Sequence, residues 1–526
     1  MPTLSALTWI GNACAALLGS HGSVTAAAGR AGCSRQSVYD HADKVQQAVE
    51  QARLPGPSRE ELLRENARLL KDNRLLRQQL THARRLQRHT IRLDPDAQRH
   101  FAAVAHAMGL SFNQIEDLFA LLFRHALLAP AARGPGRSTI ARWVRHAACR
   151  AGKILAVLDA LTRPLALLLA LDEIFFHGRP VLTAVEPHSF ALLLCQRGPD
   201  RTAATWLAAL RPFGALEYAV SDQGSGLQAA LAAWRRERQA GGQKPLVGGL
   251  DLFHIEQEAQ KVLSGVWRKV EARWEKAEAA DRRVARARDP RGPLATARAA
   301  WRQAESNFAW HSQWEQSWRR ARQAFELFRP DGRLNDRAWA RQEIEAACRA
   351  MTAYQWRKVV AMVRDERALS FLDRMHEQLA AAVPEEELRD ALVELWRLSH
   401  AGTRTAQGVT QAAVQQVICA RLDGGWLAKY EGVKKVLGSV VRASSAVECV
   451  NSVLRMQQAR HRNVSQEMLD LKRLYWNTRP FRCGKRRDRC PYQLLGAKLP
   501  TFDFWKLLRC DPEKLAQELS SPQLAA

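Results

Sequence analysis

Three acidic residues of this chain occupy settings that favour chemistry over simple solvation. Asp172 interrupts an apolar run that reads as a strand, where a carboxylate is costly to bury unless it is paired or binds a cation. Asp222 ends a later expected strand, and the glycines after it let the chain turn sharply. Glu448 stands among small and apolar residues on an expected helix, beside a stripe that begins at Val447. Two aspartates on neighbouring strands and one acid on a packing helix would form a set of cation ligands.

Such a set suits phosphoryl transfer. That reaction uses two divalent ions about 4 Å apart, which activate the nucleophile and neutralise the leaving oxygen. Mg²⁺ takes a few carboxylates together with water and substrate oxygens, and Mn²⁺ accepts similar ligands. We therefore expect Mg²⁺ or Mn²⁺, as two ions. Taken singly, each acid also has a structural alternative, as a helix N-cap, a turn aspartate or a member of an ion pair.

A mixed sheet is expected to position the two aspartates. Short apolar runs bounded by Gly, Pro or His predict strands, and longer amphipathic runs predict helices. The expected strands span 164–176, 179–185, 189–195, 216–220 and 246–250, and the expected helices span 202–210 and 226–238, with another entered at about 253. This order, βββαβαβ, predicts an α/β domain with helices packed on a mixed sheet.

From about residue 265 to 440 the chain changes to long helical stretches rich in Arg, Glu and Ala. Ten of the 16 tryptophans lie here, and three of them, starting at Trp310, recur every four residues and so share a helix face. We interpret this face as helix core rather than as a base-stacking platform. The stretch predicts a large all-α insertion that interrupts the α/β domain. Glu448 follows it on a helix expected over 443–460, capped by Ser444 or Ser445.

The charge of the chain indicates its class of partner. Its 526 residues include 79 Lys and Arg against 53 Asp and Glu, which gives a formal net charge of +26. This surplus favours a polyanion, and nucleic acid is the first candidate because neutralised phosphates release condensed counterions. An apolar fraction of 47% excludes a disordered basic tail. The alternative is a basic protein from a GC-rich genome, whose codons favour arginine.

The cysteines and the apolar runs bear on the compartment. None of the ten cysteines forms a C-x-x-C pair, so neither a zinc ribbon nor a thioredoxin-like site is indicated. Their scatter suits a reducing cytosol better than a disulfide framework. The longest apolar run, 164–171, is too short to cross a bilayer. We therefore expect a cytoplasmic protein.

Two short helices joined by a tight turn are expected near the N-terminus. An alanine-rich helix over 24–30 precedes a turn at Gly32, and Ser34 can cap a second helix over 35–49. This pattern is typical of a helix-turn-helix. The residues that its second helix would offer to a DNA major groove are Arg35, Gln36, Ser37 and Tyr39. The alternative is a helical hairpin with no role in DNA binding.

A heptad seam follows the breaker Pro-Gly-Pro at 55–57. Its members are Leu62, Asn66, Leu69, Asn73, Leu76, Leu80 and Ala83. Leucine at d and asparagine at a favour an in-register, two-stranded coiled coil, so we expect a homodimer or a higher oligomer. The alternative is an intramolecular helical hairpin.

Two more basic regions follow. A second helical region contains an amphipathic helix over 112–123 and a later helix that Ser138 is expected to cap, with Arg142 and Arg145 on it. Near the C-terminus a basic patch contains Arg479, Arg482, Lys485, Arg486 and Arg487. Helical packing alone and a solvated charged loop are the respective alternatives. Arg455, Arg460 and Arg462, on and after the Glu448 helix, complete the residues expected to bind double-stranded DNA.

The acids and their surroundings resemble a known family. Strands carrying Asp172 and Asp222, followed by a helix carrying Glu448 in Ser-Ser-x-x-Glu-x-x-Asn-Ser, resemble the DDE transposases of bacterial insertion sequences. Those enzymes have an RNase H-like catalytic core, and in some an α-helical insertion precedes the glutamate, as the long interval after Asp222 would allow here.

Two further motifs carry the resemblance. Asp251-Leu-Phe-His254 resembles the C/D-x-x-H signature of Mutator-like transposases and their bacterial relatives. The segments 474–481 and 490–496 resemble the W-N-x-R…P-Y-x-L-L-G ending common in these enzymes. The resemblance covers about 165–264 and 440–497.

The resemblance implies roles for these residues. Asp172, Asp222 and Glu448 would be catalytic and hold the metal pair, and Asp251 and His254 would be auxiliary, positioning DNA or the metal ligands. Asp251 as a helix N-cap and His254 as a packing residue are the alternatives. Glu173 and His177 flank the first aspartate and are not expected to be ligands.

The implied function is that of a DNA transposase. It would bind the terminal inverted repeats of its own element, hydrolyse a phosphodiester with Mg²⁺-activated water, and let the freed 3′-hydroxyl attack target DNA. One alternative is a sequence-specific DNA-binding regulator derived from a transposase, without catalysis. Another is a structural or RNA-associated basic protein whose Trp-rich α block is the interaction surface.

These expectations divide the chain into seven regions. They are a helix-turn-helix region (1–55), a coiled-coil helix (58–90), a second helical DNA-binding region (97–160), the first part of an RNase H-like core (163–264), the α-helical insertion (265–440), the final part of the core with the glutamate helix and basic tail (441–500), and a C-terminal tail (501–526).

Overall fold

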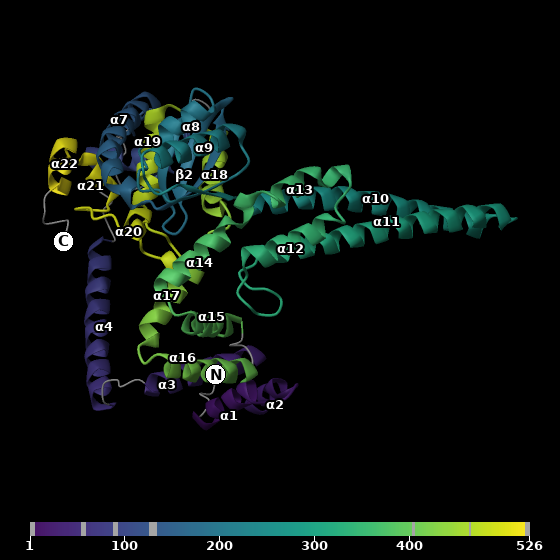
Figure 1. Ribbon diagram of the computed structural model, residues 1–526. Coiled ribbons are helices and arrows are strands. Elements are labelled where there is room, and N and C mark those ends of the chain that lie inside the picture. The colour runs from purple at the N-terminus through teal and green to yellow at the C-terminus, as the bar shows by residue number, and fades with distance from the viewer. Residues whose placement is uncertain are drawn as a thin grey trace. The chain divides into compact units, whose positions relative to one another are not determined.

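The computed structural model describes residues 6–53, 59–87, 93–125, 134–401, 406–461 and 464–520. The chain forms two compact units, each built from segments distant in sequence (Figure 1). The first unit comprises residues 1–91 and 379–436, and the second comprises 92–378 and 437–526.

The first unit begins with three packed helices. These are α1 (Ala6–Leu17), α2 (Ser23–Ala31) and α3 (Arg35–Arg53). Ala27, Ala28 and Val38 are buried where α2 meets α3. Gly32, with φ 62°, makes the turn between these helices, and the Ser34 hydroxyl accepts the Ser37 N–H at 3.0 Å. The expected helix, turn and capped helix are therefore present.

The rest of the first unit is also helical. It contains α4 (Arg59–Gln87), α15 (Glu386–Ala401), α16 (Ala406–Leu422) and most of α17 (Trp426–Gly438). On α4, Leu69, Leu76 and Leu80 are each more than half exposed. The side chains of Leu62 and Ala83 and the breaker at 55–57 lie outside the described residues. Pairing of α4 with a second copy stays a prediction.

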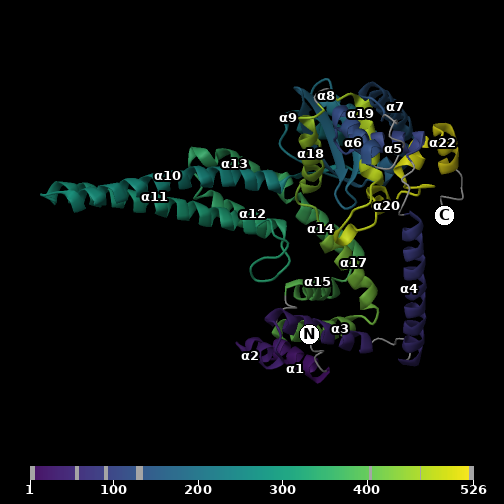
Figure 2. The ribbon, with the colours of Figure 1, turned by 180° about the vertical axis from the view of Figure 1, so that it is seen from behind.

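The second unit is built around a mixed five-stranded sheet in the order β3-β2-β1-β4-β5 (Figures 1 and 2). The strands are β1 (Leu168–Phe176), β2 (Arg179–Glu186), β3 (Ala191–Arg197), β4 (Tyr218–Ser221) and β5 (Val247–Leu250). β1, β2 and β3 are antiparallel neighbours, whereas β4 and β5 run parallel to β1. With α8 (Ala203–Leu210) and α9 (Ser225–Ala240) the order is βββαβαβ, as the sequence predicted.

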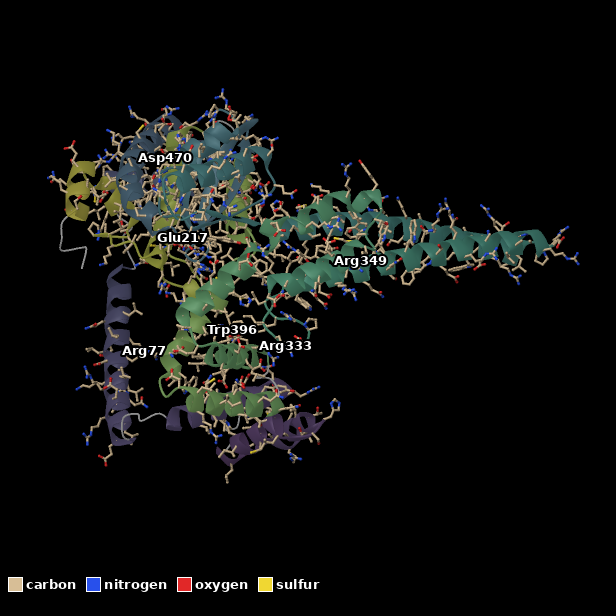
Figure 3. All side chains as sticks on the ribbon, viewed as in Figure 1. Arg77, Glu217, Arg333, Arg349, Trp396 and Asp470 are labelled. Carbon is tan, nitrogen blue, oxygen red and sulfur yellow. The ribbon has the colours of Figure 1, made fainter. Side chains whose placement is uncertain are left out.

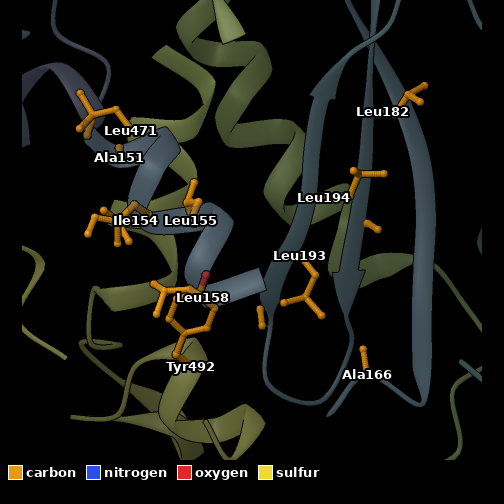
Figure 4. Close-up of a cluster of buried hydrophobic side chains, with 14 of the residues drawn as sticks. Ala151, Ile154, Leu155, Leu158, Ala166, Leu182, Leu193, Leu194, Leu471 and Tyr492 are labelled. Atoms are coloured by element: carbon orange, nitrogen blue, oxygen red, sulfur yellow. The ribbon is translucent and has the colours of Figure 1, made fainter. Parts of the chain in front are cut away.

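Both faces of this sheet are covered by helices. On one face Leu169 and Leu171 share a core with Trp206 of α8 and Leu227 of α9. The same core extends to α7 (Arg137–Thr162), which packs beside β3, with Leu158 near Leu193 and Tyr492 (Figure 4).

The opposite face carries α18 (Ser445–Gln458). Ala170 and Ile174 of β1 pack there against Ala446, Val447 and Val450. Alternate residues of β1 therefore serve two cores, because successive side chains of a strand point to opposite faces. Asp172 belongs to the α18 side.

The insertion is helical throughout its described residues, apart from short connections. α10 (Leu252–Arg286) and α11 (Arg291–Gln323) form a long antiparallel hairpin (Figures 1 and 2), in which Trp301 donates to Asp281 at 2.6 Å. α10 passes residue 265 without a break, because no Gly-Pro breaker interrupts it. Of the three tryptophans on one face, Trp314 and Trp318 are buried, while Trp310 is 60% exposed.

Shorter helices lead back from the hairpin to the sheet. They are α12 (Arg337–Cys348), α13 (Arg357–Val363) and α14 (Ser370–Ala382), with 3₁₀ turns at Tyr354–Trp356 and Glu366–Leu369. The start of α14 is held at the sheet because Tyr218 hydrogen-bonds Ser370 at 3.1 Å and Glu217, labelled in Figure 3, pairs with Arg374 at 3.8 Å.

The remaining helices of the second unit surround α7. They are α5 (Pro95–Ala107), α6 (Phe112–His125), α19 (Gln466–Thr478), α20 (Pro491–Leu495), α21 (Phe504–Arg509) and α22 (Pro512–Ser520), with 3₁₀ turns at Arg163–Leu165 and Gly484–Arg486. The expected Ser138 cap is wrong: α7 begins at Arg137, two residues earlier than that cap predicts, and Gly136 is its N-cap. No described helix combines the length and apolarity needed to cross a membrane.

Candidate functional site

The sheet register aligns three aspartates in one row. Leu171 of β1 lies opposite Ser221 of β4, and Ser221 lies opposite Leu250 of β5. The next residue on each strand is acidic: Asp172, Asp222 and Asp251. Because the three strands are parallel neighbours in register, the residues that follow Leu171, Ser221 and Leu250 lie side by side. β1 continues to Phe176 beyond the ends of β4 and β5, so this row lies where the sheet narrows.

Helix α18 brings Glu448 to the first of these acids. Asn451, one turn after Glu448, donates from Nδ2 to Asp172 Oδ2 at 2.6 Å and is fully buried. Residues three apart share a helix face, so Glu448 lies on the same side. Burial, the charge of Glu448 and, more weakly, that of Asp222 raise the pKa of Asp172 to about 7. The charges of both other catalytic candidates therefore act on Asp172.

Arg455 and the imidazole of His254 contact the carboxylate cluster that Asp172, Asp222, Asp251 and Glu448 form. Arg455 Nη1 donates to Glu448 Oε2 at 3.0 Å, and its Nη2 lies 3.8 Å from Asp172 Oδ2. His254 Nε2 lies 3.8 Å from Glu448 Oε1. A hydrogen bond with Asp251 raises the pKa of His254 despite its partial burial, with smaller contributions from Asp222 and Asp172. Arg455 therefore places a positive charge beside Asp172 and Glu448, and His254 adds one beside Glu448 when it is protonated.

Asp251 is the most fully satisfied acid of the row. It is completely buried and accepts the Phe253 N–H at 3.0 Å and the Ser444 N–H at 2.9 Å through Oδ1, and His254 and the Ser444 hydroxyl through Oδ2. Burial alone would raise its pKa, but these hydrogen bonds hold the pKa below its usual value. Asp251 is therefore the N-cap of α10 and also joins that helix to the start of α18.

The donor set fits a divalent cation. As the side chains lie, no three His, Cys, Asp or Glu groups among the described residues surround one point. Yet carboxylate oxygens are the ligands that Mg²⁺ prefers. Beside Asp172, the buried Asn451 Oδ1 has no hydrogen-bond partner among the described residues, and Asp222 uses only Oδ1 to accept the Gly224 N–H at 2.9 Å. A cation bound between Asp172 and Glu448 would reduce the repulsion that raises the pKa of Asp172, and Asp222 Oδ2 and Asn451 Oδ1 have no hydrogen-bond partner among the described residues.

The flanking candidates of the first strand lie away from this cluster. Glu173 points to the other face of the sheet, where it accepts from Trp206 at 3.1 Å and from Arg201 at 3.3 Å. His177, with φ 49°, is exposed in the turn that leads to β2.

The residues expected to bind DNA lie in several places. Arg35 and Gln36 are exposed at the start of α3, where Gln36 donates to Asp40, and Ser37 is partly buried. Arg142 and Arg145 are exposed on α7, and Arg460 is exposed just after α18. Arg462 lies outside the described residues.

The C-terminal basic residues differ in how firmly they are held. Arg479 lies over Trp476, and Arg486 lies over Phe190 and donates to the His188 carbonyl at 2.9 Å. Arg482, Lys485 and Arg487 are exposed, and Arg487 has only Asp488 nearby, at 3.4 Å. Arg486 is thus part of the fold, whereas its neighbours are available to a ligand.

Two residues, Asn451 and Ser444, were not assigned to the site from the sequence. Asn451 stands in the motif that carried the resemblance, and its spacing of three from Glu448 is the signal that could have assigned it. Ser444 was expected only as a cap. It occupies the N-cap position of α18 but makes no capping bond, because its hydroxyl donates to Asp251.

The candidate site thus draws on three stretches of the chain: β1, the segment from Asp222 to His254, and the start of α18. Sheet register aligns the first two, and the contacts of Asn451 and Ser444 attach the third. Comparison of the chain with models of protein families, with curated proteins and with solved structures finds no match.

Proposed function

We propose that the chain is a DDE-type DNA transposase with an RNase H-like core, a metal-dependent enzyme that cuts and joins DNA strands. One observation carries this proposal. Asp172 and Asp222 stand in register on adjacent parallel strands, and Glu448 on α18 lies close to Asp172, because Arg455 reaches both carboxylates. Burial and the charge of Glu448 together raise the pKa of Asp172 to about 7. The βββαβαβ order and the helical stretch before Glu448 support it.

Asp172, Asp222 and Glu448 would hold Mg²⁺ or Mn²⁺. When bound, the ions supply an activated water and neutralise charge at the scissile phosphate. The chain's own residues prepare the site: Asn451 fixes the orientation of Asp172, and Asp251 fixes His254 and the start of α18. Arg455 balances the acids and can turn toward a DNA phosphate, since it is 47% exposed.

Binding to double-stranded DNA follows from the charge and from the helical regions. The net charge of +26 supplies attraction, and α2 and α3 have the form of a helix-turn-helix. The exposed leucines of α4 would pair two copies, so that each copy binds one terminal inverted repeat.

The direct test is strand cleavage. The substrate is DNA that carries the inverted repeats flanking the gene, with Mg²⁺ present. Asp172→Asn, Asp222→Asn and Glu448→Gln should each lower the rate at least about 100-fold, because losing a ligand should cost more than losing its supporting residue. Glu275→Gln, an exposed acid on α10, is the matched control and should cleave normally. Full activity in any of the three variants would remove that residue from the site.

A catalytically inactive regulator is the second candidate. The contact between Arg455 and Glu448 favours it, because a cationic side chain already balances the acids. A regulator would bind the repeats equally well with EDTA and leave both strands intact. The same assay therefore separates the two functions.

A further inference from the structure

A cavity of about 640 Å³ lies in the second unit, apart from the carboxylate cluster. It is lined by residues of α5, α6 and α7, by the end of α18 and by the start of α19. Its volume falls in the range of about 300–1,000 Å³ that is typical of ligand pockets. The proposed catalytic residues do not line it.

Three arginines give this cavity its charge. Arg137 and Arg145 come from α7, and Arg460 follows α18. All three are exposed, and no carboxylate among the described residues pairs with them. Glu467 is the acidic residue among the described lining residues. Unpaired guanidinium groups around a concave surface attract anions, and their planar donors match phosphate oxygens.

A helix N-terminus adds to this attraction. α7, a helix of 26 residues, begins after Gly136, which has no side chain to cap its first N–H groups. The positive end of a long helix with uncapped N–H groups is a favourable place for an anion. By contrast, Ser465 already caps α19 by accepting the Met468 N–H.

Two buried imidazoles supply a second, independent observation. His106 and His461 line the cavity, are 5% and 8% exposed, and stack with ring centroids 4.3 Å apart. The Nδ1 atom of each is buried without a partner among the described residues. His461 Nε2 donates to the Leu110 carbonyl at 2.9 Å, so its Nδ1 is left as an acceptor. The phosphodiester oxygens of DNA carry no hydrogen to give this atom, whereas the amino group of a nucleobase does.

The cavity and the carboxylate cluster lie at opposite ends of α18. Glu448 is in the first turn of that helix, and Arg460 comes twelve residues later. At 1.5 Å per residue the helix from Glu448 to Gln458 spans about 15 Å, and Arg460 lies two residues beyond its end. B-form DNA rises 3.4 Å per base pair, so about five base pairs reach from Glu448 to just past the end of this helix.

We propose that this cavity binds one nucleotide of the bound DNA, about five positions from the phosphate at the carboxylates. Its phosphate contacts Arg137, Arg145 and Arg460, and its base meets the stacked histidines. The place assigned along the DNA rests on the proposed function. Occupancy of the cavity by a nucleotide does not.

Cys149 provides the test, because it is exposed and lines the cavity. The full chain in EDTA is alkylated with iodoacetamide, and the modification of each cysteine is followed by mass spectrometry. Deoxyadenosine monophosphate and a 30-base-pair duplex should each slow the alkylation of Cys149 at least about threefold. Cys14, which is also exposed, is the internal reference for the mononucleotide, which should leave its alkylation unchanged.

Variants then assign the effect. Arg145→Ala should abolish protection and reduce the slope of log affinity against log salt for the duplex by about one, as for one lost phosphate contact. Arg302→Ala, which removes an exposed charge on α11, should change neither quantity.

Each contrary outcome overturns one part of the proposal for this cavity. Protection by neither probe removes the cavity as a nucleotide site. Protection by the mononucleotide but not the duplex makes the ligand a free nucleotide, and equal protection by inorganic phosphate removes the role of the base. Because EDTA prevents cleavage, the alkylation experiment measures binding alone. Its outcome can therefore be told apart from a failure of the catalytic proposal.

Discussion

The carboxylate cluster and the arginine cavity are opposites in how they are built. Asp172 and Asp251 are buried, lie in one row with Asp222 at the sheet, and accept hydrogen bonds from Asn451, and from Ser444 and His254, respectively. The arginines of the cavity are exposed and have no carboxylate partners among the described residues. A buried charge must be satisfied or it destabilises the fold, whereas an exposed one costs little. The buried acids therefore limit the stability of the second unit, whereas the exposed arginines can bind a ligand at little cost to folding.

The largest effect on stability should come from neutralising Asp172. Its pKa, raised from 3.8 to about 7, means that the folded state binds a proton more tightly than the unfolded state. Stability is therefore lost as pH rises from about 4 to 7. Asp172→Asn should raise the free energy of unfolding at pH 8 by at most about 4 kcal/mol and change it little at pH 4.

Urea unfolding at the two pH values, without divalent ions, measures this difference. The substitution preserves packing, because Asn451 can turn its amide so that its Oδ1, which has no described partner, accepts from the new amide at position 172. Asp117→Asn, an exposed acid on α6, is the control. Equal stability of wild type and variant at pH 8 would mean that the acids are not strained by one another.

Removing Asp251 should have the opposite sign. Asp251→Ala leaves His254 and the Ser444 N–H without a partner, so the free energy of unfolding should fall by about 3 kcal/mol. Asp251→Asn should lose less, because an amide still accepts at Oδ1. Thermal unfolding followed by circular dichroism tests both. A loss below about 1 kcal/mol in the alanine variant would show that Asp251 does not hold α18.

Divalent ions should stabilise the acid cluster and leave the cavity unaffected. For a dissociation constant near 1 mM, 10 mM Mg²⁺ would add about 1.4 kcal/mol of stability. This gain should disappear in Asp222→Asn and persist in Arg145→Ala. Differential scanning calorimetry with Mg²⁺ and with EDTA makes the comparison. An equal gain in the Asp222 variant would place the ion elsewhere.

The smallest effect should be that of the cavity arginines on folding. Arg145→Ala removes an exposed side chain that no described carboxylate pairs with, so the free energy of unfolding should change by less than about 0.5 kcal/mol. The same urea titration measures it. A loss above about 1 kcal/mol would give Arg145 a structural role and weaken the contrast between the two regions.

The strands could be predicted because their signals are local. Apolar runs ending at Gly, Pro or His define β1 to β5, and the acids at their ends are visible in the sequence. That Asp251 joins the row of Asp172 and Asp222 depends on β5 lying beside β4, which is a tertiary fact. The hydroxyl of Ser444 also found a distant partner in place of its local cap.

The cavity could not have been foreseen in the same way. Arg145 and Arg460 were each recognised as basic, but the sequence contains no sign that α7 and the end of α18 meet around one cavity. The two histidines are separated by most of the chain and stack only in the folded state. A site that forms where the ends of distant helices meet produces no periodic pattern in the sequence.

The single helix α10 has a mechanical consequence. It has 35 residues, so it is about 52 Å long, and pairing with α11 stiffens it. Its first turn is fixed through Asp251 to Ser444, four residues before Glu448. The helix is therefore a long rod that is anchored at one end, beside the carboxylate cluster. A small rotation about this end would therefore displace the tip of the hairpin by many ångströms.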